Sequence, residues 1–122
     1  MTKQAKPRPK LEDIKGAVAT VFNVEASDID VKDRSHKYGR ARGAVVLVAR
    51  DIGMTNQQIA EGLAYKRASE GAGTVSQLNS KALSWQISND KGFATQISKV
   101  RGWLQRNGFN VRPQTNPEFR NS

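Results

Sequence analysis

The residues best suited to binding chemistry are cations gathered in one short segment of the chain. Positions 32–42 hold five basic side chains and one acid, whereas acids collect just before them. The basic residues are Lys32, Arg34, Lys37, Arg40 and Arg42. Because apolar periodicity is missing from 32–43, its first part is expected to be an exposed loop. A locally positive loop favours contact with a polyanion, and nucleic acid is the usual one.

Catalytic chemistry is poorly represented. The sole histidine, His36, lies in the same basic segment without an evident carboxylate partner, so a solvent or phosphate contact is favoured over a general base. The chain has no cysteine, no clustered His/Asp/Glu ligand set, and no glycine-rich loop followed by Lys-Ser/Thr. We therefore expect a protein that is not an enzyme and that uses no cofactor, metal or nucleotide.

A second polar set follows in the sequence, on a predicted helix. Glutamine and asparagine can make paired hydrogen bonds to adenine, and short polar side chains can reach base edges. The candidate DNA contacts of this helix are Thr74, Ser76, Gln77, Asn79 and Lys81, with Lys66 and Arg67 as phosphate contacts in the connection before it. The alternatives are an ordinary polar helix face and a solvated pair of cations.

The whole chain favours the same class of partner. Its 122 residues carry 20 Lys+Arg against 11 Asp+Glu, a formal net charge of +9, which suits double-stranded DNA. A merely basic protein and binding to an anionic membrane surface are the alternatives. No apolar run approaches the roughly 18–20 residues that span a bilayer, and no apolar stretch typical of a secretion signal follows the basic first ten residues. We expect a cytoplasmic, nucleoid-associated protein without a membrane partner.

Apolar spacing predicts the helices that must position these residues. The predicted helices cover 11–22, 40–52, 56–63, 74–86 and 91–106, with one short turn at 26–31 and a connection over 64–73. Thr55 and Gln58 form a capping-box pattern at the start of one helix. Trp85 and Trp103 lie on apolar stripes and are assigned to the core.

The predicted fold is therefore all-α, a compact bundle of about five to six helices that contains a helix-turn-helix. The second helix of that motif, here 74–86, enters the major groove with its N-terminal residues. The connection before it is longer than the usual three to four residues. Residues 1–10 are expected to be a basic flexible arm and 109–122 a flexible tail, which leaves 11–108 as the DNA-binding domain.

A succession of short motifs resembles one known family. The motifs are Val21-Phe22-Asn23-Val24, Ala26-Ser27-Asp28-Ile29, the basic loop, Arg40-Ala41-Arg42 and Asn56-Gln57-Gln58-Ile59-Ala60. Their order resembles the C-terminal DNA-binding domain (domain IV) of the bacterial replication initiator DnaA, a Trp-repressor-like fold, over residues 11–106. The resemblance implies that Arg34 enters the minor groove, that Arg42 and Lys37 contact the DNA backbone, and that the helix-turn-helix reads the major groove.

The chain departs from that family at the start of the recognition helix. Where the family has Asp-His-Thr-Thr-Val, this sequence has Gly71-Ala72-Gly73-Thr74-Val75, and the family's ATPase module has no counterpart here. The resemblance implies a stand-alone factor that binds duplex DNA sequence-specifically and regulates replication initiation or transcription, with replication or transcription proteins as further partners. Two alternatives stay open. One is a generic helix-turn-helix transcription regulator, and the other is a protein-interaction module or adaptor that lost base readout.

Overall fold

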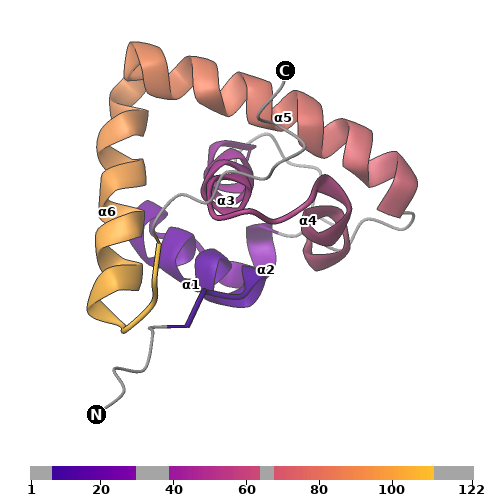
Figure 1. The fold of residues 1–122 in the computed structure, drawn as a ribbon. Helices are drawn as coiled ribbons and strands as arrows, with labels where there is room; N and C mark the ends of the chain where they lie inside the picture. Colours follow the sequence, from indigo (N-terminus) through magenta and orange to yellow (C-terminus); the bar gives the residue numbers. More distant parts are fainter. Residues whose placement is uncertain (1–6, 30–38, 64–67, 112–122) are drawn as a thin grey trace.

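The computed structural model describes residues 7–29, 39–63 and 68–111, and this part of the chain is built from helices without a strand. The helices are α1 (Leu11–Phe22), α2 (Ala26–Ile29), α3 (Gly39–Asp51), α4 (Asn56–Gly62), α5 (Ala68–Ser88), the 3₁₀ turn η2 (Asp90–Gly92) and α6 (Phe93–Arg106). Figure 1 shows α3 in the middle, α5 along one side, and α1 and α2 on the opposite side. The predicted all-α fold class is confirmed.

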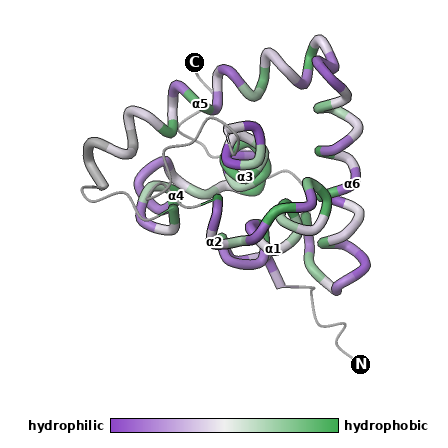
Figure 2. Tube along the Cα trace, turned by 180° about the vertical axis from the view of Figure 1, so that it is seen from behind, coloured by the Kyte–Doolittle hydropathy of each residue, from purple (hydrophilic) through white to green (hydrophobic). Residues whose placement is uncertain are grey.

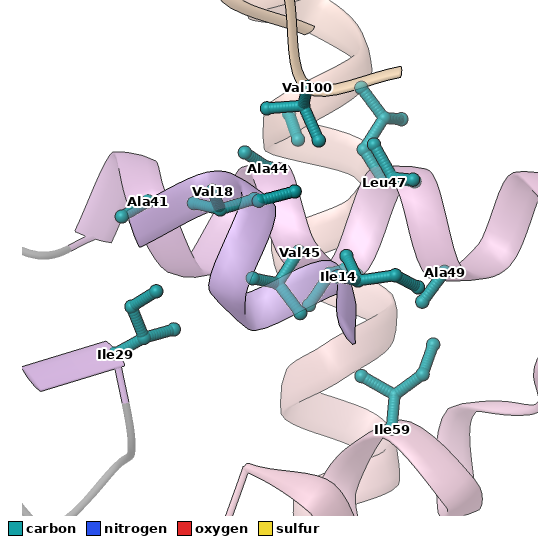
Figure 3. Packing of buried hydrophobic residues seen from close by; sticks show 14 of the residues in the cluster. Ile14, Val18, Ile29, Ala41, Ala44, Val45, Leu47, Ala49, Ile59 and Val100 are labelled. Atoms are coloured by element: carbon teal, nitrogen blue, oxygen red, sulfur yellow. The ribbon is translucent and has the colours of Figure 1, made fainter. Parts of the chain in front are cut away.

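Burial of α3 organises the fold. Every residue from 43 to 49 is buried, and Ala41 and Ile52 extend this run at either end. The helix packs against each of the other five α-helices, and Figure 3 shows Ile14, Val18 and Ile59 gathered around it. A surface helix buries one face, whereas α3 is buried around almost its whole circumference. A helix that is apolar on all sides is stable only where its neighbours enclose it. Figure 2 shows hydrophobic residues along α3 in the middle of the molecule.

Small residues let the neighbouring helices approach α3 closely. Ala44 and Ala49 are fully buried. A Cβ atom placed on Gly43 would lie 3.0 Å from a ring atom of Trp85 and 3.6 Å from the Cβ of Ala82, both on α5. α5 therefore packs on α3 at a point where the absence of a side chain creates the space.

Local signals set several helix ends. The Thr55 hydroxyl accepts a hydrogen bond from the Gln58 backbone N–H at 3.1 Å, and the Gln58 side chain accepts one from the Thr55 N–H at 2.9 Å. This is the predicted capping box at the start of α4. Asn23 ends α1 in the left-handed conformation, with φ 58°, which asparagine tolerates better than most residues. At the start of α6 the Asn89 side chain accepts from the Ala94 N–H at 2.9 Å.

The prediction of a connection over 64–73 is wrong in its second half. α5 begins at Ala68, so Gly71 and Gly73 lie inside the helix, and it runs on to Ser88 rather than ending near 86. Glycine costs about 1 kcal/mol relative to alanine within a helix, which is why the sequence favoured a loop. Gly71 is buried, and α5 packs more extensively against α4 than any other pair of helices in the described chain. Tertiary packing therefore outweighs the low local helix propensity.

The two ends of the described chain lie together beside α6. The Asn110 backbone N–H donates to the Pro7 carbonyl at 2.9 Å, and Pro9 and Val111 are buried. These residues belong to the segments predicted as arm and tail, yet they contact the domain. Figures 1 and 2 agree that this end of the molecule is far from α5.

The start of α5 can be tested by Gly73→Ala. Nothing lies within 4 Å of a Cβ placed on Gly73, so the substitution should raise the free energy of unfolding by about 0.5–1 kcal/mol through higher helix propensity. Urea unfolding followed by circular dichroism measures the change. Gly16→Ala, at an equally open site inside α1, is the matched control. If Gly16→Ala stabilises the protein and Gly73→Ala does not, residue 73 is not helical.

Candidate nucleic-acid interface

α4 and α5 are the consecutive helices that the sequence predicted as a helix-turn-helix. Residues 63–67 separate the two helices, so the link is one residue longer than the usual three to four of such a turn. On the inward side of α5, Gly71, Val75 and Ala82 are buried, while Leu78 and Trp85 pack against the core as partly buried residues. The opposite side of this helix, about 30 Å long at 1.5 Å per residue, faces outward.

The outward side of α5 carries most of the predicted base-contacting residues. Thr74, Ser76, Gln77 and Lys81 are exposed. Lys81 is the only charged group among the described side chains of α5. This face therefore offers hydrogen-bonding groups more than positive charge. Such groups can distinguish base edges, whereas phosphate is bound chiefly by cations.

Asn79 is placed differently from these four residues. It is half-buried, and its side-chain oxygen is buried without a hydrogen-bond partner. In an α-helix each residue is rotated by about 100° from the one before, which turns Asn79 towards the edge of the inward face. Gln77 is therefore the better placed of the two predicted adenine-reading amides.

The early start of α5 changes the role of Thr74. The free backbone N–H groups that attract phosphate belong to the first turn of a helix, and that turn begins at Ala68. Thr74 and Ser76 lie more than one turn further along. Their side chains, rather than their backbone N–H groups, are what they can offer to a ligand.

Arg40, predicted as a DNA contact, is bound to other residues of the protein. Its Nη1 donates to the Asp90 backbone carbonyl at 3.2 Å, and its Nη2 is paired with the Asp90 carboxylate. The guanidinium carbon lies 4.7 Å from the centroid of the Trp85 ring, within range of a cation–π contact. The side chain is 29% exposed. The sequence identified Trp85 as a core residue but gave no signal for this cluster, because its members are 45 and 50 positions apart from Arg40.

Arg42 also has a partner within the protein. Its Nε donates to the Ile29 carbonyl at 2.8 Å, which ties the last residue of α2 to the first turn of α3. Near the other end of α3, the Arg50 side chain donates to the side chain of Asn56, the first residue of α4. The Asp51 carboxylate accepts from Arg101 of α6. Charged residues at the two ends of α3 thus link it to its neighbours.

The remaining predicted contacts lie outside the described residues. They are Lys32, Arg34, Lys37, Lys66 and Arg67, and His36 belongs with them. The described residues next to 30–38 are Ile29, the last residue of α2, and Gly39, the first of α3. The described residues next to 64–67 are Leu63 and Ala68.

Other kinds of site receive no support from the described part of the chain. Over 7–29, 39–63 and 68–111 there is no group of three or more His, Cys, Asp or Glu residues that could hold a metal ion. Within the same ranges no helix is long and apolar enough to cross a membrane. Comparisons with protein-family models, curated proteins and solved structures found no match.

The bond between Arg42 and α2 can be tested by Arg42→Ala. The substitution leaves the Ile29 carbonyl without its charged donor, so it should lower the free energy of unfolding by about 1–2 kcal/mol. Urea unfolding measures the loss, with Lys81→Ala as a control that removes an exposed cation and should change stability by less than about 0.5 kcal/mol. Equal stabilities of the two variants would show that Arg42 does not hold α2.

Proposed function

We propose that this protein binds duplex DNA sequence-specifically, with α5 as the helix that enters the major groove. The observation that carries the proposal is the polar outward face of α5, formed by Thr74, Ser76, Gln77 and Lys81, on a helix anchored by α4 and α3. The net charge of +9 supplies the attraction to phosphate. By occupying its sites on the nucleoid, the protein would regulate replication initiation or transcription.

The basic segment is the second part of the proposed interface. Arg34 is assigned to the minor groove, where a narrow groove concentrates negative potential and attracts arginine. Lys32, Lys37, Lys66 and Arg67 are assigned to phosphate. This division follows the resemblance to the DnaA C-terminal domain, which stays a hypothesis. It also accords with the engagement of Arg40 and Arg42 inside the protein, since other cations then have to meet the DNA backbone.

A second candidate function is a protein-interaction module, and one observation favours it. Leu83 and Ile87, one turn apart on α5, are 42% and 85% exposed. At about 100° per residue they lie roughly 120° around the helix from Gln77 and Lys81 respectively. Ser76 lies within about 20° of both Leu83 and Ile87 around the helix, so a partner on this apolar flank would cover Ser76 and leave Thr74, Gln77 and Lys81 uncovered. A duplex mobility shift separates the two functions, because a module without DNA binding gives no shift.

The salt dependence of binding tests the electrostatic part of the proposal. If about 4–6 phosphates are neutralised, log K against log salt should fall with a slope of about −4 to −5, at about −0.9 for each phosphate. Fluorescence anisotropy with a labelled random duplex measures the slope between low and physiological salt. Absence of binding at low salt, or an affinity that salt leaves unchanged, contradicts DNA binding.

Base readout is tested by Gln77→Ala. Loss of a productive base contact should weaken binding to the preferred duplex by about 1–3 kcal/mol, which is about 5- to 160-fold, and leave binding to random duplex almost unchanged. The preferred duplex comes from selection out of a random library. Gln105→Ala is the matched control, since Gln105 is exposed on α6. An equal loss on both duplexes would mean that α5 does not read sequence at Gln77.

A further inference from the structure

We infer that Arg40 is a positioning residue, which holds the C-terminal end of α5 in place rather than contacting DNA. The inference rests on the proposed function, because α5 is the helix assigned there to the major groove. It changes the role of a residue that the sequence placed in the interface, and it makes Asp90, an acid, a requirement for binding a polyanion.

Three contacts hold the Arg40 guanidinium. One face lies over the Trp85 ring, with 4.7 Å between the guanidinium carbon and the ring centroid, while two nitrogens meet the carbonyl and the carboxylate of Asp90. Trp85 in turn meets Phe93 of α6 edge to face, with 5.4 Å between the ring centroids. This Arg40 cluster (Arg40, Trp85, Asp90 and Phe93) joins α3 to α5, η2 and α6.

The Arg40 cluster holds the turn between α5 and α6, and the backbone of this turn is not stable by itself. Asn89 and Lys91, on either side of Asp90, both have left-handed backbones, with φ values of 50° and 49°. Residues with a Cβ atom adopt this conformation at a cost and keep it only where the surroundings hold it. Arg40 bonds to both the backbone and the side chain of the residue between them. It therefore stabilises the turn from α5 into α6.

The geometry leaves Arg40 little to offer a phosphate. A planar guanidinium can stack on a ring and donate at its edge simultaneously, which an ammonium group cannot do. With both functions engaged and 29% of the side chain exposed, contact with DNA would require the cluster to break. The turn between α5 and α6 holds the C-terminal end of α5, and Gln77 and Lys81 face outward from this helix. Arg40 therefore affects DNA binding indirectly, by setting the orientation of α5.

The charge of Asp90 allows a test in which the two roles predict opposite results. Asp90→Ala and Glu25→Ala each remove one negative charge, and Glu25 is exposed between α1 and α2. If Asp90 only repels phosphate, both variants bind duplex DNA at least as tightly as wild type. If the cluster orients α5, and its loss leaves a tenth to a fifth of molecules competent, Asp90→Ala binds the preferred duplex about five- to tenfold more weakly. Equal or tighter binding by Asp90→Ala overturns the inference.

Arg40→Ala separates positioning from direct contact. A phosphate contact would contribute about −0.9 to the slope of log K against log salt. A positioning residue lowers affinity about five- to tenfold, as Asp90→Ala does, but leaves the slope as in wild type. Circular dichroism at the binding temperature confirms that each variant is folded, so that loss of structure is not counted as loss of affinity. A slope reduced by about one unit assigns Arg40 to DNA and overturns the inference.

Amide hydrogen exchange in the absence of DNA tests whether the Arg40 cluster holds the end of α5. In Asp90→Ala, exchange over 82–88 should accelerate relative to wild type and to Glu25→Ala, while exchange in α1 stays the same. Unchanged exchange over 82–88 overturns the inference. Wild-type protein that binds no duplex at low salt overturns the proposed function instead, and the exchange result still decides whether Arg40 holds α5.

Discussion

The enclosure of α3 is the constraint on which the rest of the structure depends. Its apolar residues from 43 to 49 are too hydrophobic all round to form a surface helix, and each buried valine or leucine contributes about 1.5–3 kcal/mol relative to exposure. The other helices meet because they cover this one. Gly43 shows how closely, since a Cβ atom placed there would lie only 3.0 Å from the Trp85 ring of α5. The placement of α5, and with it the proposed DNA-binding face, follows from how α3 is covered.

The charged residues at the ends of α3 complete this arrangement. Arg40, Arg42 and Arg50 leave a buried helix and reach the backbone or side chains of neighbouring elements, and Asp51 pairs with Arg101. Some of the cations behind the net charge of +9 therefore bind groups within the protein, and these are not available to bind a polyanion. A count of cations overstates the charge available for binding wherever arginines also act as hydrogen-bond donors inside the protein.

Helix boundaries were predictable where local chemistry sets them. Their prediction was wrong where tertiary packing sets them. The bounds of α1 and the Thr55–Gln58 capping box follow from periodicity and capping, both short-range effects. The start of α5 did not, because Gly71 and Gly73 have low helix propensity, and the packing of α5 as a whole against α4 outweighs it. Among the candidate contacts, exposure of Gln77 and Lys81 was foreseeable from the apolar positions around them, since those positions fix which side of a helix is buried.

The sequence by itself determined the all-α class, the order of the helices and the excess of positive charge, because composition and apolar spacing act over a few residues. It could not determine which cations remain available to a partner. Arg40 and Arg42 look alike in the sequence, two positions apart in a basic stretch. Only the tertiary structure brings one to Asp90 and Trp85 and the other to the Ile29 carbonyl. The reason is that these contacts join residues 13 to 50 positions apart, and their distances exist only once the helices have packed around α3.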